Sequence, residues 1–223
     1  MYCVGESCNM EKKFCIFDMD GTLVDSMGYW RQLGREYLLR KGISEEQTDR
    51  VLKELQVMSI PKAAVLFQQT LGISLTQEEL VEEMQDLMEC HYQNDVLLKP
   101  GVLEYLEKLK EKKCRMCVAT ATHQRLARGC LKHLGIDQYF EFVLSCKMLG
   151  VGKDRPDVYL HAARQLGSRP EETAVFEDVL YAAQTAKSAG FYTVAVWDQN
   201  AAHEWDRMIS LADEVVERWS DAK

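Results

Sequence analysis

No apolar run in the sequence approaches the roughly 18 residues that a membrane-spanning helix needs. The stretch Met1–Lys13 also lacks the apolar centre of a signal peptide, so we expect a cytoplasmic protein that does not act at a membrane. Positive charge is in deficit: 27 Lys and Arg residues face 35 Asp and Glu residues, giving a net charge of -8. This deficit argues against nucleic acid as the main partner. An anionic substrate would therefore need a metal ion or a local basic pocket.

Cysteine is too sparse for a disulfide scaffold, with eight residues in the whole chain. A redox or zinc role for the Cys114-x-x-Cys117 pair would need a second pair of ligands or a helix N-terminus beside it, and the pair lies on a predicted strand. We expect the cysteines in or beside apolar segments to pack as small buried thiols: Cys15, Cys117, Cys130 and Cys146. The sequence also has no internal repeat and no low-complexity tract.

The chain does contain enough apolar material for a substantial core, because 47% of its 223 residues are hydrophobic and 28% are charged. From Tyr29 to about Asp95, apolar spacing and capping signals predict helices only. Thr76 and Glu79, for example, have the spacing of a capping box. The helices expected in this stretch are Tyr29–Lys41, Ser44–Leu55, Pro61–Leu71 and Thr76–Tyr92.

Strands alternate with helices after Lys99. The expected strands are Phe14–Phe17, Arg115–Ala119, Phe140–Leu144, Thr173–Phe176, Tyr192–Trp197 and a short one that includes Val215 and Val216. The expected helices between them are Val102–Lys112, Gln124–Leu134, Pro156–Leu166 and Leu180–Ala189. Such alternation is typical of right-handed βαβ units and a parallel sheet covered on both faces. We therefore predict an α/β fold, a doubly wound parallel sheet formed by residues 1–27 and 97–223, with an all-helical insertion at 28–96.

Two acids follow the first expected strand directly. Asp18 stands at its carboxyl end, Asp20 comes two residues later, and Gly21 would permit a tight turn there. Two carboxylates this close repel each other unless a cation or a shared proton separates them. One interpretation is a magnesium site in which one carboxylate also attacks an electrophile. The alternative is a helix cap or an Asx-turn, which is common for an isolated Asp-Gly.

Other strand ends of a doubly wound sheet deliver polar residues to the same edge. Thr120, with Thr122 close behind, follows one strand, Glu177 and Asp178 follow another, and Lys153 lies in a loop that leads into a helix. Each alone is typical of a cap or a surface charge. Together, up to four carboxylates predict a divalent cation, and oxygen ligands without His or Cys favour Mg²⁺ over zinc. A hydroxyl and an ammonium suit the oxygens of a phosphoryl group.

Four short motifs occur in order along the chain, each after an expected strand or before an expected helix. They are Phe17–Thr22, Val118–Thr120, Lys153 with Pro156–Tyr159, and Phe176–Asp178 with Ala186 and Ala189–Gly190 downstream. In this combination the sequence resembles the haloacid dehalogenase-like superfamily, in the branch with a helical cap between the first and second motifs. The resemblance implies a Rossmann-like catalytic core formed by residues 1–27 and 97–223, with the cap at 28–96.

The resemblance also implies roles for the residues that match the motifs. Asp18 would be the nucleophile, and Asp20 would be the general acid and then the general base. Thr120, Ala121 and Lys153 would bind the substrate through the oxygens of its phosphoryl group, with Thr120 and Lys153 also counted as catalytic.

A Mg²⁺ ion is the implied cofactor. Asp18, the backbone carbonyl of Asp20 and Asp178 would hold it, and Glu177 would be a further ligand or would position a bound water. The reaction implied is Mg²⁺-dependent hydrolysis of a small phosphomonoester, such as a sugar phosphate or a similar metabolite, through an aspartyl-phosphate. The resemblance implies no oligomeric state.

Two other functions stay open. A sugar-phosphate mutase of the β-phosphoglucomutase type would use the same core residues, but such enzymes usually carry a histidine shortly after the first motif and an arginine in a cap loop. Here Asp25–Arg31 has no histidine and Leu55–Ile60 has no arginine. A catalytically idle binding protein of the same fold is less favoured, because every acidic and basic group of the motifs is present.

Three residues depart from the usual motifs. Asp154 stands where proline normally follows the lysine, Val179 stands where Ser or Thr normally follows the acidic pair, and Tyr181 stands where a small residue is usual. None of these changes removes a catalytic group. They bear instead on the substrate contacts near the fourth motif.

Overall fold

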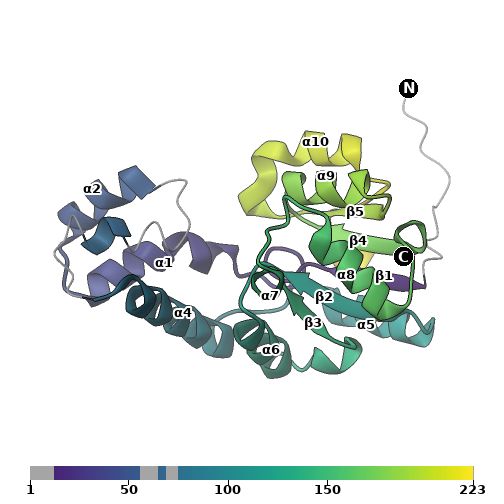
Figure 1. Cartoon of the computed structure of the whole chain (residues 1–223), viewed down its shortest axis with the longest axis horizontal. Helices are drawn as coiled ribbons and strands as arrows, with labels where there is room; N and C mark the ends of the chain where they lie inside the picture. Colours follow the sequence, from purple (N-terminus) through teal and green to yellow (C-terminus); the bar gives the residue numbers. More distant parts are fainter. Residues whose placement is uncertain (1–12, 56–64, 69–74, 223) are drawn as a thin grey trace. The chain divides into compact units, whose positions relative to one another are not determined.

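The computed structural model describes residues 13–55, 65–68 and 75–222. The described residues form two compact units, shown with their elements labelled in Figure 1. Residues up to Asp25 together with those from Leu97 onward form the α/β unit, and Ser26–Val96 form the helical unit. None of the described helices is long and apolar enough to cross a membrane.

The α/β unit is built on a six-stranded sheet with the order β3-β2-β1-β4-β5-β6, and every neighbouring pair is parallel. Its strands are β1 (Phe14–Phe17), β2 (Arg115–Thr120), β3 (Val143–Ser145), β4 (Thr173–Glu177), β5 (Tyr192–Val196) and β6 (Glu214–Val216). The predicted α/β fold with a parallel sheet is therefore confirmed. β1 lies at the centre, between β2 and β4, so the chain leaves the middle of the sheet at Asp18.

Helices follow most strands of this unit. They are α5 (Val102–Glu111), α6 (Gln124–His133), α7 (Cys146–Leu149), α8 (Asp157–Leu166), α9 (Leu180–Ser188) and α10 (Trp205–Leu211), with 3-10 segments at Asp137–Tyr139, Pro170–Glu172, Gln199–Glu204 and Trp219–Asp221. α8 ends at Gly167, whose φ of 73° is a left-handed conformation that glycine adopts without strain. The sequence patterns did not indicate α7 or α10, because both are too short for clear periodicity.

One predicted strand is wrong in its extent. The strand expected at Phe140–Leu144 is observed as Val143–Ser145, preceded by the 3-10 turn Asp137–Tyr139. Phe140 lies outside the strand and packs edge-on against Phe17 of β1, with ring centroids 6.0 Å apart. Phe140 is therefore apolar because it packs against a residue of the sheet. Sequence periodicity cannot distinguish such a position from one within a strand.

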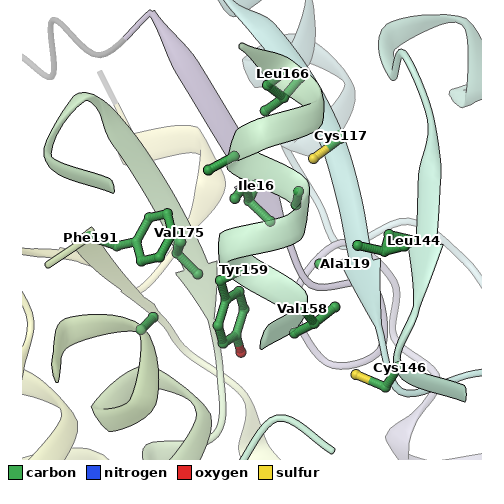
Figure 2. Packing of buried hydrophobic residues seen from close by; sticks show 13 residues of the cluster. Ile16, Cys117, Ala119, Leu144, Cys146, Val158, Tyr159, Leu166, Val175 and Phe191 are labelled. Carbon is green, nitrogen blue, oxygen red and sulfur yellow. The ribbon is translucent and has the colours of Figure 1, made fainter. Parts of the chain in front are cut away.

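Apolar residues cover both faces of the sheet. On one face, α8 packs over β1, β2 and β4, and Figure 2 shows residues of this cluster, among them Ile16, Cys117, Val175 and Leu166. On the other face, Phe17 and Phe176 stack with ring centroids 4.3 Å apart, beside Trp219 and Tyr105. This alternation along β1 and β4 follows from the two-residue repeat of a strand. The expected burial of four cysteines is confirmed, for Cys15, Cys117, Cys130 and Cys146.

The described part of the helical unit contains helices and no strand: α1 (Met27–Arg40), α2 (Glu45–Leu55), a short helical segment at 65–68 and α4 (Gln77–Asn94). The capping box predicted at Thr76 and Glu79 is present at the start of α4. Most of the helix predicted at Pro61–Leu71 lies outside the described residues.

A charged cluster ties α1 to the end of α4. The Nε2 atom of His91 lies 2.6 Å from a Glu36 oxygen, and its Nδ1 atom lies 2.7 Å from an Asp95 oxygen. Arg40 pairs with the other oxygen of Glu36 at 2.7 Å. We refer to Glu36, Arg40, His91 and Asp95 as the His91 cluster.

Candidate active site

The carboxyl end of β1 is held firmly in the sheet. The backbone N–H of Asp18 donates to the carbonyl of Phe176 in β4, at 3.0 Å. Directly afterwards the chain folds back on itself, because the Met19 carbonyl accepts the backbone N–H groups of Leu23 and Val24. Gly21 within this turn has φ of 81°, which supports the prediction that glycine permits a tight turn here.

Three buried acids converge at this end of the sheet. Asp18, Glu177 and Asp178 each bring a carboxylate oxygen within 4.8 Å of the others. Lys153 joins them from the loop before α8, with its Nζ 2.5 Å from Asp18 Oδ1 and 2.7 Å from Glu177 Oε1. The structure therefore brings together four of the residues that the sequence pointed to, from three separate parts of the chain. We call Asp18, Lys153, Glu177 and Asp178 the acidic cluster.

Charge in the acidic cluster is unbalanced, since three carboxylates face one ammonium. Burial, and then the Asp18 and Glu177 carboxylates, hold the pKa of Asp178 well above its usual value. Burial likewise raises the pKa of Asp18, and it raises the pKa of Glu177 to about 7. Burial alone would lower the pKa of Lys153, but Asp18 and Glu177 raise it instead, so this side chain stays charged. A further cation would let all three acids ionise at neutral pH.

The donor set fits a hard divalent cation such as Mg²⁺. Glu177 Oε2 is buried and has no hydrogen-bond partner among the described residues, although Oε1 accepts two hydrogen bonds. Asp178 Oδ1 accepts the hydroxyl of Thr22 at 2.9 Å, which fixes that carboxylate. A buried acceptor without a donor is costly unless an ion or a water meets it. The three converging acids offer oxygen only, which is the ligand chemistry that Mg²⁺ prefers.

Asp20 lies apart from the three converging acids. Its carboxylate is half-buried and accepts the hydroxyl of Thr122 at 2.7 Å. The backbone N–H of Thr122 in turn donates to the hydroxyl of Thr120 at 3.0 Å, and Thr122 O accepts the hydroxyl of Ser145 at 2.7 Å. Thr120 is the buried last residue of β2, and Ala121, at the start of the turn that follows, is exposed. This turn links the ends of β2 and β3 to Asp20.

Two hydrogen bonds at the site involve residues to which the sequence gave no role. The hydroxyl of Tyr159, in α8, donates to Glu177 Oε1 at 2.7 Å. The indole N–H of Trp219 donates to the carbonyl of Thr22 at 3.1 Å and so braces the turn after Asp18. In the sequence, the one indication of a role for Tyr159 was a hydroxyl group on an otherwise apolar face of α8. The sequence gave no indication of a role for Trp219.

Two of the departures from the usual motifs line the same cavity. Asp154 and Tyr181 contribute to a hollow of about 440 Å³ beside the exposed face of α9, together with Gln184 and Ser188. Tyr181 is about half exposed. Among the described residues no Lys or Arg lines this hollow, so it differs in charge from the neighbourhood of Lys153.

Comparisons with known proteins agree with this geometry. The chain is 29% identical to a phosphorylated carbohydrates phosphatase of Thermotoga maritima, over 78% of this chain and 80% of the relative. It is 29% identical to the fructose-1-phosphate phosphatase YqaB of Escherichia coli, over 81% of this chain and 94% of the relative. Its fold matches the structure of CbbY from Rhodobacter sphaeroides in complex with xylulose-1,5-bisphosphate, with a TM-score of 0.77, 20% identity, and 94% and 96% of the two chains covered.

The family assignment rests on a match that covers most of the chain. Residues 12–190 match the family model of the haloacid dehalogenase-like hydrolases, a range that contains all four motifs and the whole acidic cluster. The two relatives named above carry the names of phosphatases. The chain therefore belongs to the haloacid dehalogenase-like hydrolase family.

Proposed function

We propose that this protein is a Mg²⁺-dependent phosphatase that hydrolyses a small phosphomonoester, of the sugar phosphate kind, through an aspartyl-phosphate on Asp18. The observation that carries the proposal is the acidic cluster. In it, Asp18 Oδ1 lies 2.5 Å from Lys153 Nζ, and two further buried acids lie beside Asp18. A nucleophile at this position needs its own negative charge and a positive counterpart for the incoming phosphate. Lys153 and a divalent cation would supply that positive charge together.

In the first half of the reaction, an Asp18 oxygen forms a bond to phosphorus while the bond to the leaving alkoxide breaks. Asp20 gives its proton to that alkoxide, and it stands two residues from the nucleophile with its carboxylate oriented by Thr122. Lys153 holds the phosphoryl oxygens and keeps Asp18 ionised by its charge. Mg²⁺, held by Asp18, Asp178, the Asp20 carbonyl and Glu177, would offset the charge of the phosphoryl group.

In the second half, water attacks phosphorus of the aspartyl-phosphate. Asp20 takes a proton from that water, the bond between Asp18 and phosphorus breaks, and inorganic phosphate leaves. Asp18 is then a carboxylate again and Asp20 carries the proton for the next cycle. The pairing of one buried and one half-exposed acid supports these different roles, because only the half-exposed acid can exchange protons with water readily.

The substrate class is inferred from the relatives. Two of them are named as phosphatases, one for phosphorylated carbohydrates and one for fructose-1-phosphate. Each is matched over more than three quarters of this chain. A hydroxyl-rich leaving group also fits the acidic character of the chain outside the site, which disfavours a second large anion.

The test is release of inorganic phosphate from p-nitrophenyl phosphate and from a panel of sugar phosphates, with and without Mg²⁺. We expect turnover that needs Mg²⁺ and falls by more than about 10⁴-fold in Asp18→Asn, the range typical of a lost nucleophile. Glu36→Gln, which changes an acid of the helical unit, is the matched control. Turnover of a hexose phosphate only with a bisphosphate primer would replace the phosphatase with a mutase. No turnover of any phosphomonoester would favour an idle binding protein.

A further inference from the structure

We infer that Tyr159 is a positioning residue for the cation: its hydroxyl holds one oxygen of Glu177 so that the other oxygen faces the ion shared with Asp18 and Asp178. The inference rests on the proposed function, because it needs a cation at the acidic cluster. It adds a residue of α8 to the site and gives that residue a task distinct from packing.

The two oxygens of Glu177 have different surroundings. Oε1 accepts two hydrogen bonds, from Lys153 Nζ and from the Tyr159 hydroxyl, each at 2.7 Å. Oε2 is buried and has no hydrogen-bond partner among the described residues. Because both donors lie on the Oε1 side, rotation of the carboxylate would break two hydrogen bonds to charged or buried groups. Oε2 is thereby kept as the oxygen of Glu177 that a cation at the acidic cluster would meet.

The core fixes the position of the Tyr159 hydroxyl. The side chain is fully buried, and its ring packs edge-on against Phe191 with centroids 6.2 Å apart. In Figure 2 the ring lies beside the apolar residues of the cluster, and its hydroxyl oxygen points away from Ile16 and Leu166. A buried hydroxyl costs free energy unless it is hydrogen-bonded, and phenylalanine would fill nearly the same volume without that cost. The hydroxyl is therefore explained by its contact with Glu177 and not by packing.

Lys153 alone would fix Glu177 less well. Its ammonium is shared between Asp18 and Glu177, and in the proposed reaction it also holds phosphoryl oxygens. As Asp18 forms its bond to phosphorus, the pull of Lys153 on Glu177 changes. The Tyr159 hydroxyl donates to Glu177 and is not the group that Asp18 and Glu177 share, so we expect its hydrogen bond to persist through both halves of the reaction. Hydrogen bonds from outside the ligand set commonly change metal affinity by 10- to 100-fold.

The experiment compares the wild-type protein with Tyr159→Phe in two Mg²⁺ titrations. One measures the rate of p-nitrophenyl phosphate hydrolysis, and the other measures the rise in melting temperature with Mg²⁺ in the absence of substrate. In both titrations we expect the Mg²⁺ concentration at half-effect to rise about tenfold in the variant. At saturating Mg²⁺, kcat and the KM for p-nitrophenyl phosphate should stay within twofold of wild type, because excess cation compensates for the weaker site.

Tyr105→Phe is the matched control. Tyr105 is also a buried tyrosine of the α/β unit, but it packs against Phe176 and Trp219 on the other face of the sheet. Its variant should titrate with Mg²⁺ as the wild type does. In a Glu177→Ala background, where there is no carboxylate to position, Tyr159→Phe should produce no further shift.

The outcomes separate this inference from the function on which it rests. Wild-type half-effect concentrations for Tyr159→Phe in both titrations would overturn the inference and leave the phosphatase proposal intact. A lower melting temperature without Mg²⁺, combined with an unchanged Mg²⁺ response, would assign Tyr159 to packing and would equally overturn it. If the wild type itself shows no Mg²⁺ response in either titration, the proposed function fails, and the inference fails with it.

Discussion

The acidic cluster of the α/β unit and the His91 cluster of the helical unit differ both in burial and in charge balance. All four residues of the acidic cluster are buried, whereas in the His91 cluster only His91 is buried and Arg40 and Asp95 are exposed. In the His91 cluster, two acids face two bases, and each nitrogen of the His91 ring lies within 2.7 Å of a carboxylate oxygen. In the acidic cluster, three acids face one lysine, and Glu177 Oε2 lacks a hydrogen-bond partner among the described residues.

This difference separates a structural contact from a binding site. In the His91 cluster the opposite charges satisfy one another and water still reaches Arg40 and Asp95, so the cluster joins α1 to α4 and needs no ligand. A group with excess negative charge is stable only when protons or a cation neutralise it. The acidic cluster therefore lowers the free energy of unfolding of the metal-free protein, and a bound cation would raise it again. The predictions below test this contrast.

The largest expected effect is on catalysis, from a single acid beside the acidic cluster. Asp20→Asn should lower kcat by 10²- to 10⁴-fold, the usual contribution of a general acid and base, while the protein keeps its melting temperature. Glu36→Gln, in the His91 cluster, should leave kcat within twofold. Steady-state kinetics with p-nitrophenyl phosphate and a sugar phosphate measure both. An Asp20→Asn variant within threefold of wild type would remove Asp20 from the mechanism.

The second effect is on stability and its dependence on pH without metal. The pKa of Glu177 is raised from 4.5 to about 7 in the folded protein, so the folded state binds this proton more tightly than the unfolded state does. Stability should therefore fall as pH rises from about 5 to 7, by up to about 3 kcal/mol from this group. Added Mg²⁺ should reduce the fall.

Urea unfolding with EDTA, repeated across that pH range, measures the trend. Glu177→Gln is the control, and its stability should fall less steeply because the titrating group is gone. A metal-free wild-type protein that gains stability between pH 5 and 7 relative to Glu177→Gln would contradict the assignment.

The third effect is on the His91 cluster. Burial alone would lower the pKa of His91, but its hydrogen bonds to Asp95 and Glu36 raise it above its usual value. His91→Phe should cost about 1–2 kcal/mol of stability, a figure reduced for the partial exposure of both acids, with kcat unchanged. Because the folded pKa is raised, this contribution is fully present below the ordinary pKa of 6.5 and is lost as pH rises through the folded pKa. Unfolding at pH 6 and pH 9 checks the sign.

The smallest effect is expected from the hydrogen bond that orients Asp20. Thr122→Val removes the hydroxyl that contacts Asp20 and should lower kcat several-fold, which corresponds to roughly 1 kcal/mol for one hydrogen bond. Thr48→Val is the matched control in the helical unit, because the Thr48 hydroxyl is buried there without a partner among the described residues. That variant should keep kcat and be at least as stable as wild type. If Thr122→Val and the wild type have equal kcat, the hydrogen bond from Thr122 is not what orients the Asp20 carboxylate.

Local sequence patterns were enough to predict most of the fold and the end of the sheet at which the candidate site lies. Asp18 follows β1, Glu177 is the last residue of β4 and Asp178 follows it, so the parallel sheet alone brings these acids to one edge. Lys153 is different, because no strand delivers it, and only its charge, its place before a helix and the resemblance to the family pointed to its role. The contact between Thr122 and Asp20 joins residues far apart in sequence, and spacing carries no information about it.

The remaining features depend on packing in three dimensions. Phe140 was expected at the start of the strand that ends at Leu144, but it lies outside that strand and packs against Phe17. A hydrophobic pattern does not distinguish tyrosine from phenylalanine at position 159, and only the structure reveals that the Tyr159 hydroxyl donates to Glu177. Trp219 follows the last strand with no motif around it, although it braces the turn that follows Asp18.

The central position of β1 has a consequence for how the protein is made. β1 leaves the ribosome before either of its partners, and the strand it pairs with through Phe14 and Arg115 is synthesised about a hundred residues later. Throughout that interval the helical unit can collapse on its own, while the four-residue apolar segment that precedes Asp18, the proposed nucleophile, has neither neighbouring strand to pair with. Nascent chains stalled after the helical unit should therefore be a target for chaperones, and those stalled after β4 should not.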